Sequence, residues 1–390
     1  MEKKKKMVPK LRFKEFVDAG DWEQRKLGEV AEIVGGGTPS TNVSEYWDGN
    51  INWYTPAEIS DQIYLESSQR KITEEGYSSC SAKMLPVGTV LFTSRAGIGK
   101  TAILSRKSCT NQGFQSIVPH KDKLDSYFVF SRSEELKRYG ETVGAGSTFV
   151  EVSGKQMADM DLMLPKNITE QQIIGSYFKN LDHLITLHQR KVDKLQQVKK
   201  AHLCEMFPEN GKTKPKRRFK CFTDDWEQRK LGDCFTERVE SMPEGELISV
   251  TINDGIKKFS ELGRHDNSND DKSKYKKVCI GDIAYNSMRM WQGASGYSPY
   301  EGIVSPAYTV LSPNLGINSK CLAYQFKMPE MIHTFQVNSQ GITSDNWNLK
   351  YPAFSQIEIF VSKYEREQAQ IAEYFEKLDN LITLHQHKGG

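Results

Sequence analysis

The sequence predicts an α+β protein in which one plan occurs twice, each copy a mixed α/β domain followed by a long helix. Two repeated blocks carry this prediction. Residues 177–191, YFKNLDHLITLHQRK, return as residues 374–388, YFEKLDNLITLHQHK, with eleven of fifteen positions identical. Residues 9–16, PKLRFKEF, return as residues 215–222, PKRRFKCF, and WEQRKLG follows both. Such repeats indicate a duplicated framework. The stretches between the repeated blocks share little sequence, so the two inserts have diverged.

Composition argues against a disulfide framework, a metal site and a membrane span. The net charge of +3 gives no strong global field, but residues 3–14 and 212–220 are rich in Lys and Arg. Basic runs often contact phosphate backbones, although solvated tails have the same composition. The seven cysteines form no CxxC pair, which indicates reduced thiols and a cytoplasmic protein without a metal site. No apolar run approaches the roughly 18 residues of a membrane span.

The first insert predicts a strand, a turn and a second strand. Residues 35–40, GGGTPS, form a loop by composition. Residues 87–93 and 102–104 predict strands, and the turn between them ends in GKT. It is not a phosphate loop, because Ser94 stands where that motif needs glycine and no helix follows. The tip should present Ser94, Arg95 and Lys100. Helical character over 125–138 and a strand over 160–164 complete this insert.

Each repeated helix has an apolar face that needs a partner. A capping pattern at 169–172 starts the first helix, and 38 residues to Met206 make a rod of about 57 Å. Apolar positions then step by three and four residues, with polar positions at His188, Lys199 and His202. The second helix starts with a capping pattern at 362–365. The predicted contact face comprises Ile174, Phe178, Leu181, Ile185, His188, Val192, Leu195, Ile371, Phe375, Leu378 and Ile382.

The second insert follows the first in outline. A strand is predicted at 281–285, a tip at 286–296 and a closing strand at 357–361. No catalytic motif accompanies these elements: the chain has no Pro-Pro or Pro-Asp pair, which excludes the usual amino-methyltransferase tetrapeptide and the start of a common nuclease motif. We therefore expect a non-catalytic chain. An enzyme with an unrecognised site and a protein-interaction scaffold built on the coiled coil remain as alternatives.

The residue types at the tips suit the reading of DNA. Arg and Gln can make bidentate contacts with guanine and adenine edges, while Lys contacts phosphates and positions the protein. For Arg95 and Arg289 the alternative is a surface or salt-bridge role, and for Trp291 a place in the core. The candidate DNA contacts are Thr38, Ser40, Tyr54, Ser94, Arg95, Lys100, Arg217, Arg218, Arg289, Trp291 and Gln292.

These motifs resemble the specificity subunits of type I restriction–modification systems. The resemblance rests on the duplicated PKxRFKxF and WEQRKLG blocks, EYWDGNINWYTPAEI at 45–59, LFTSRAGIGKTAI at 91–103 and the EQxxIxxYFxxLDxLITLHQxK helices. It implies a first target-recognition domain at 1–165, a helical spacer at 166–210, a second recognition domain at 211–362 and a shortened helical region at 363–390. The helices should pack as an antiparallel coiled coil.

The resemblance also implies partners. A bipartite sequence in double-stranded DNA would be chosen by this chain. Two modification subunits would bring S-adenosylmethionine and the methyltransferase chemistry. Restriction subunits would bring ATP- and magnesium-dependent translocation and cleavage, and this chain would hold no cofactor itself.

One departure from the pattern concerns the second helix. In an antiparallel pair, nothing after Lys388 is available to cover the contact face around Ile174, Phe178 and Leu181. We expect the isolated chain to be poorly soluble and to be rescued by the modification subunit, because exposed apolar patches promote association.

Overall fold

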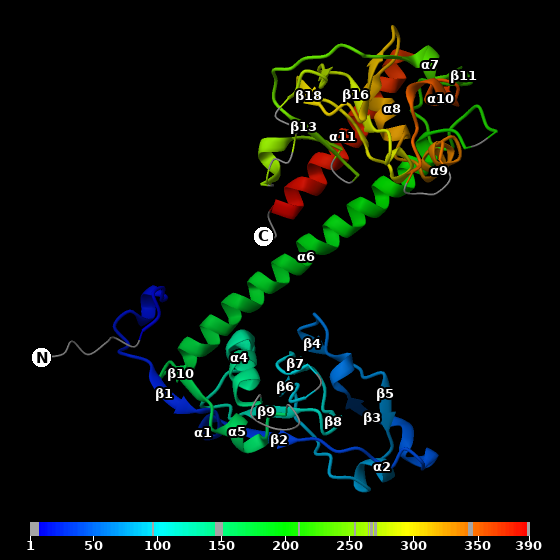
Figure 1. Ribbon diagram of the computed structural model, residues 1–390. Coiled ribbons are helices and arrows are strands. Elements are labelled where there is room, and N and C mark those ends of the chain that lie inside the picture. Colours follow the sequence, from blue (N-terminus) through cyan, green and yellow to red (C-terminus); the bar gives the residue numbers. More distant parts are fainter. Residues whose placement is uncertain are drawn as a thin grey trace, which may run out of the picture. The chain divides into compact units, whose positions relative to one another are not determined.

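The computed structural model describes residues 8–387 except 96, 145–150, 210, 253–254, 264, 266–267, 269–270 and 342–345. The chain divides into two compact units, Met1–Ile185 and Thr186–Gly390, which Figure 1 colours from blue to green and from green to red. The division falls inside helix α6, Ile168–Met206. Each predicted recognition domain therefore belongs to a different unit, and the predicted spacer helix is divided between the units.

The first unit contains a five-stranded sheet, a three-stranded sheet and a strand pair. In spatial order these are β2-β9-β6-β7-β4, β5-β3-β8 and β1-β10. The strands are β1 Glu23–Lys26, β2 Ala31–Gly35, β3 Trp47–Tyr54, β4 Tyr64–Leu65, β5 Arg70–Ile72, β6 Val90–Phe92, β7 Thr101–Leu104, β8 Cys109–Thr110, β9 Gln115–Pro119 and β10 Asp161–Leu164. The helices are η1 Lys14–Phe16, α1 Leu27–Val30, η2 Ser44–Tyr46, η3 Pro56–Glu58, α2 Glu74–Ser78, α3 Ser126–Phe130, α4 Ser133–Gly144 and α5 Gly154–Ala158.

The second unit is built from smaller sheets. Their orders are β12-β19-β16-β17, β13-β14, β15-β18 and β11-β20. The strands are β11 Glu227–Lys230, β12 Phe235–Glu237, β13 Ile248–Thr251, β14 Gly255–Lys258, β15 Lys276–Val278, β16 Ile283–Asn286, β17 Ser295–Tyr297, β18 Gly302–Val304, β19 Tyr308–Pro313 and β20 Glu358–Val361. The helices are α7 Leu231–Cys234, η4 Phe259–Leu262, η5 Met290–Gln292, α8 Ser319–Gln325, α9 Pro329–Val337, α10 Tyr351–Phe354 and α11 Glu365–His387.

The repeated blocks build the same framework in both units. WEQRKLG supplies β1 and β11, and each pairs antiparallel with the closing strand of its insert, β10 or β20. Those closing strands lie where the alternation of apolar residues predicts them. Strands β6 and β16 lead into the predicted tips. Val90–Phe92 of β6 and residues 283–285 of β16 are all buried, which shows that both faces of these strands are covered.

Charged contacts tie the first repeated block to the start of each long helix. Arg12 Nε and Nη2 each donate to a different Glu170 carboxylate oxygen at 2.7 Å, and Arg218 makes the same bidentate contact with Glu367 at 2.6 and 2.9 Å. Both glutamates are buried, so the arginines neutralise carboxylates that would otherwise lose their hydration. Duplication of the sequence has thus produced duplication of a buried ion pair.

The start of α6 differs from the prediction by a residue or two. Thr169 is not the cap: the helix begins at Ile168, and Asn167 Oδ1 accepts a hydrogen bond from the Thr169 backbone N–H at 2.9 Å. Asn is at least as good an N-cap residue as Thr, because its short side chain can accept a hydrogen bond from the first turn. The 39 residues of α6 make it about 58 Å long.

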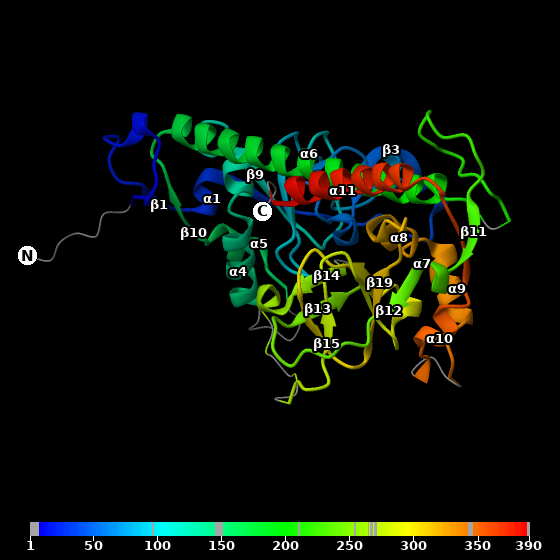
Figure 2. The ribbon, with the colours of Figure 1, turned by 90° about the horizontal axis from the view of Figure 1, so that it is seen from above.

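Within the second unit, α11 packs antiparallel to the C-terminal part of α6. The two helices lie side by side in Figures 1 and 2. Going forward along α6, His188, Lys199 and His202 contact His385, Asp379 and Tyr374, which run backward along α11. The predicted antiparallel pairing is confirmed for this part of the helices.

Candidate nucleic-acid interface

The tip of the first unit is the turn between β6 and β7, built around the side chain of Thr93. Its Oγ1 donates to the Gly97 carbonyl at 2.6 Å and accepts from the Lys100 backbone N–H at 3.0 Å. Gly97 and Gly99 have φ of 105° and 96°, values that side chains disfavour. The glycines at these positions therefore allow a tight, fixed turn, of which residue 96 lies outside the described part.

Two of the residues predicted at this tip are accessible and one is not. Arg95 is half-buried and Lys100 is exposed, with Lys100 Nζ donating to the Ile59 carbonyl at 3.2 Å. Ser94 is fully buried, and its backbone N–H donates to the Gly113 carbonyl at 2.9 Å. The expectation that the tip presents Ser94 is wrong, because this residue is buried in the first unit.

Tyr54 is also misassigned as a surface contact. It ends β3, pairs in parallel register with Thr110, and is only 1% exposed. Burial raises the pKa of its phenol to about 12. Asp48, Gly49 and Asn50 precede it in the sequence and are residue types common in loops, but β3 includes them and carries Tyr54 into the core beside Phe114.

The GGGTPS loop reaches the same edge of the first unit as the turn. The Gly37 N–H donates to the Thr110 carbonyl at 2.9 Å, and Thr38 Oγ1 donates to Gln112 Oε1 at 2.6 Å. Ser40 is exposed, and its carbonyl accepts from Trp47 Nε1 at 3.1 Å. The segment 111–113 therefore lies between the loop of Thr38 and the turn of Arg95.

Sequence reasoning missed the amide side chains of this segment. Asn111 is half-buried and Gln112 is exposed, beside a loop and a turn that both supply candidate contacts. An amide can donate to and accept from adenine in the major groove. The available signal was the sequence Asn-Gln-Gly between two short strands, a common turn composition.

The tip of the second unit is the connection between β16 and β17. Arg289 is exposed and precedes η5, while Met290 is buried beneath it. Trp291 is half-buried: its ring meets Trp347 edge-on at 5.2 Å, and its Nε1 donates to the Met288 carbonyl at 3.0 Å. Gln292 is half-buried beside it. Arg289, Trp291 and Gln292 therefore stand together at one turn.

Lys327, which follows α8, holds this turn in place through its ammonium group. Its Nζ donates to the Gly293 carbonyl at 2.6 Å and to the Ile252 carbonyl at 3.0 Å. Gly293 closes the turn with φ of 84°. One ammonium group thus ties the connection that carries Arg289 to the end of the β13 hairpin.

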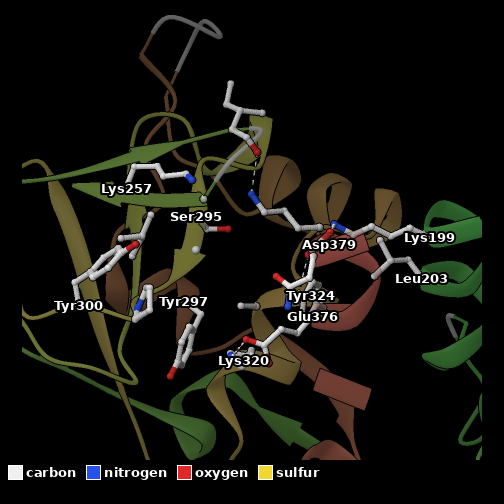
Figure 3. A pocket seen from close by; sticks show the side chains of 18 residues that line it. Lys199, Leu203, Lys257, Ser295, Tyr297, Tyr300, Lys320, Tyr324, Glu376 and Asp379 are labelled. Carbon is white, nitrogen blue, oxygen red and sulfur yellow. Dashed lines mark hydrogen bonds and ion pairs between the residues drawn. The ribbon is translucent and has the colours of Figure 1, made fainter. Parts of the chain in front are cut away.

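A hollow of about 560 Å³ lies beside Lys327 in the second unit (Figure 3). Lysines and tyrosines line it, a combination that could suit a phosphate. However, Lys320 Nζ contacts Glu376 at 2.7 Å and Lys199 Nζ contacts Asp379 at 2.5 Å. The charges of Lys199 and Lys320 are therefore already paired across the seam between α8, α11 and the C-terminal part of α6.

The two arginines of the second basic segment differ in exposure. Arg217 has a side chain 54% exposed, in an ion pair with Glu205 at 2.7 Å, and can reach a phosphate. Arg218 is 12% exposed and is held by Glu367, which raises the pKa of its guanidinium. Composition marks a basic run, but Arg218 is largely buried and paired with Glu367 of α11, so it is much less accessible to DNA than Arg217.

Among the described residues, no group of three or more His, Cys, Asp or Glu side chains could hold a metal ion. The seven cysteines are free thiols. Within the same residues, no helix has the length and apolar character needed to cross a membrane.

Taken together, the two units define a duplicated binding protein: divergent inserts carry exposed tips, and a repeated helical framework holds them. The model of the type I restriction modification DNA specificity domain matches residues 19–197 and again residues 223–389. The chain therefore belongs to the family of type I restriction–modification specificity subunits.

Individual relatives agree with this assignment. The chain is 34% identical over 181 residues to the type I restriction enzyme MjaIX specificity subunit of Methanocaldococcus jannaschii, covering 46% of this chain and 42% of that protein. It is 30% identical over 182 residues to the EcoR124I/EcoR124II specificity subunit of Escherichia coli, covering 45% and 43%. The matched part thus spans a little under half of these relatives.

A solved structure shares the fold. The S subunit of a type I restriction–modification system from M. genitalium superposes with a TM-score of 0.59 at 12% identity, covering 98% of this chain and 95% of that one. At this identity the likeness concerns the fold alone.

Proposed function

We propose that this chain selects the DNA sequence on which a type I restriction–modification complex acts, and that each tip reads one half of a bipartite target. The observation that supports it most is the exposed Arg289 at a fixed turn of one insert and Arg95 at the matching turn of the other. Repeated frameworks hold inserts of different sequence, so the two half-sites should differ.

The division of labour between contacts follows from exposure. Arg95, Arg289 and Gln292, together with Gln112, can reach base edges, whereas Lys100 and Arg217 suit phosphates. Thr38 and Ser40 belong to the loop beside Gln112. Trp291 packs on Trp347 and supports the tip more than it reads bases.

The partners in this proposal are two modification subunits and the restriction subunits. Leu184 and Leu187 on α6 are 52% and 46% exposed, and their counterparts Leu381 and Leu384 on α11 are 43% and 48% exposed. One apolar surface is therefore presented twice, which suits two copies of the same partner.

In this proposal, the partner subunits carry out the methylation and the cleavage of DNA. S-adenosylmethionine would bind the modification subunits, and ATP and magnesium the restriction subunits, while this chain works in the cytoplasm as the non-catalytic selector. The absence of a recognisable methyltransferase or nuclease motif in the sequence supports this assignment.

The test is a genome-wide map of methylated adenines in a strain that carries the modification subunit, with and without this chain. A new bipartite motif with a fixed gap, present only with the chain, is the expected result. An unchanged map, with the chain expressed and bound to the modification subunit, would contradict the proposal.

A further inference from the structure

The turns at the two tips leave their sheets in the same register, so their residues can be matched one by one. Thr93, the residue after β6, forms an antiparallel bridge with Phe114, which lies just before β9. Asn286, the last residue of β16, pairs antiparallel with Tyr308, the first residue of β19. Thr93 and Asn286 therefore occupy equivalent positions in the two units.

A buried serine follows in both units. Ser94 and Ser287 are 0% and 7% exposed, and their backbone N–H groups donate to a carbonyl of the neighbouring segment, at 2.9 and 3.4 Å. Successive side chains of an extended chain point to opposite faces, so the residue after each serine should point away from the core. That residue is Arg95 in the first unit and Met288 in the second.

Met288 presents an apolar side chain on a backbone that is fixed. Its side chain belongs to a residue 47% exposed to solvent. Its N–H donates to Asn286 Oδ1 at 3.0 Å, and its carbonyl accepts from Trp291 Nε1 at 3.0 Å. The Trp291 ring is supported in turn by its edge-on contact with Trp347. The turn thus holds Met288 in place, while its unbranched side chain can adjust to the surface that it meets.

The position of Met288 links it to the proposed DNA interface. Single exposed apolar residues are common on proteins, so its exposure alone does not mark an interaction. However, Met288 occupies the place that Arg95 has in the first tip, and it directly precedes the exposed Arg289. A surface that meets Arg289 at this turn therefore also meets Met288.

The chemistry of methionine restricts what it can contact on DNA. A thioether sulfur is only a weak hydrogen-bond acceptor, so it cannot replace the bidentate contacts of Arg or Gln. The C5 methyl group of thymine is the apolar feature of the major groove, and apolar side chains pack against it. Neighbouring Cα atoms lie about 3.8 Å apart and neighbouring base pairs about 3.4 Å, so Met288 and Arg289 suit bases one or two pairs apart.

We propose that Met288 contacts the C5 methyl group of a thymine, within two base pairs of the guanine that Arg289 reads. The inference rests on the proposed function, because it assigns a base to the tip of the second unit. The first unit has Arg95 at the equivalent place, so its half-site does not require a methyl group there.

The test uses the complex of this chain with its modification subunit, and labelled duplexes that carry the motif from the methylation map. Each thymine of the motif is replaced in turn by deoxyuridine, which removes the methyl group and leaves the base pairing unchanged. Fluorescence anisotropy at one fixed salt concentration measures the affinities. We expect one replacement to weaken binding by the wild-type complex about fourfold, the effect of one buried methyl group.

Substitutions at Met288 should remove or retain this discrimination according to their apolar character. Met288→Ala should bind the thymine and deoxyuridine duplexes equally, whereas Met288→Leu should still distinguish them. Leu315→Ala is the matched control, because Leu315 is 102% exposed and follows the end of β19 that lies away from the tip. It should keep the full effect of the methyl group. Circular dichroism verifies that the variants fold.

Three results would overturn the proposal. The motif could contain no thymine within two base pairs of a guanine, every deoxyuridine duplex could bind the wild-type complex as tightly as the thymine duplex, or Met288→Ala could leave the methyl dependence unchanged. Each of these results leaves the bipartite motif itself in place. Failure of the proposed function differs, because no motif would then appear in the methylation map, and both proposals would fall.

Discussion

At the scale of single residues, neighbouring side chains of one type perform different tasks according to burial. Arg217 and Arg218 are adjacent in a basic run, yet their side chains are 54% and 12% exposed. Glu205, the partner of Arg217, is partly exposed, while Glu367, the partner of Arg218, has no exposed side chain. Charge composition alone cannot separate these two arginines.

Removal of Arg218 should destabilise the second unit. Arg218→Ala leaves the Glu367 carboxylate buried without its cation, which typically costs about 3–5 kcal/mol. Arg217→Ala should change the free energy of unfolding by less than about 1 kcal/mol, because exposed pairs contribute little. Urea unfolding monitored by tryptophan fluorescence measures both. Equal effects for the two variants would contradict the assigned roles.

Arg289→Ala should relax sequence selection at one base pair. A bidentate arginine–guanine contact is worth about 1–3 kcal/mol of discrimination, so one position of the half-site read by the second unit should become degenerate. Methylation mapping with the variant shows this directly. Arg229→Ala, in the framework strand β11, is the control and should leave the motif unchanged. An unchanged methylation motif with Arg289→Ala would show that Arg289 makes no base-specific contact.

At the scale of elements, one helical sequence has two environments. The blocks 177–191 and 374–388 are nearly identical, but α11 is covered along its contact face and the start of α6 is not. Propensity and periodicity are the same in both, so the difference in burial comes entirely from what packs against each helix.

Equivalent truncations should therefore have unequal effects. Phe375→Ala removes a ring packed against Phe207 and Tyr324 and should destabilise the second unit by about 3–5 kcal/mol. Phe178→Ala removes a ring that is 42% exposed and should cost less than about 1 kcal/mol. Differential scanning calorimetry of both variants makes the comparison, and similar losses would show that Phe178 is already covered in solution.

The pairing of α6 with α11 should weaken at acidic pH. Burial, with a smaller effect of Arg217, lowers the pKa of His202, whose Nδ1 lies 2.5 Å from the Tyr374 hydroxyl oxygen. The folded state then binds fewer protons than the unfolded state, so stability is retained above about pH 6.5 and falls below it. His202→Gln should flatten this part of the urea-midpoint profile between pH 7 and 5. An unchanged slope would exclude His202 as the cause.

At the scale of the whole molecule, duplication supports the proposal that one chain serves two identical partners and reads two different half-sites. The framework residues repeat, including the buried Arg–Glu pairs and the exposed leucines, whereas the tips differ in sequence. Repeated surfaces favour a repeated partner, and divergent tips favour a divided target.

The exposed leucines give a prediction about stoichiometry. Leu381→Glu with Leu384→Glu should reduce the number of modification subunits bound per chain from two to one, because a charge opposes burial of one of the two surfaces. Native mass spectrometry counts the subunits. Lys377→Glu, on an exposed part of the same helix, is the charge control. Retention of two subunits by the leucine variant would place the partner elsewhere.

The sequence by itself determined the duplicated framework, the long helices, the order of strand, turn and strand in each insert, and the family. These features follow from local periodicity and from repeated blocks. Both can be recognised in a sequence without knowing which elements pack against one another. Only the tertiary structure decided that Tyr54 and Ser94 are buried, that Arg218 is held by Glu367 and that Gln112 joins the edge beside Thr38. The different burial of Phe178 and Phe375 was decided in the same way. Burial and ion pairing depend on residues that are distant in the sequence, such as Arg218 and Glu367, which are 149 positions apart. The local sequence around one residue does not show which distant residue will pack against it.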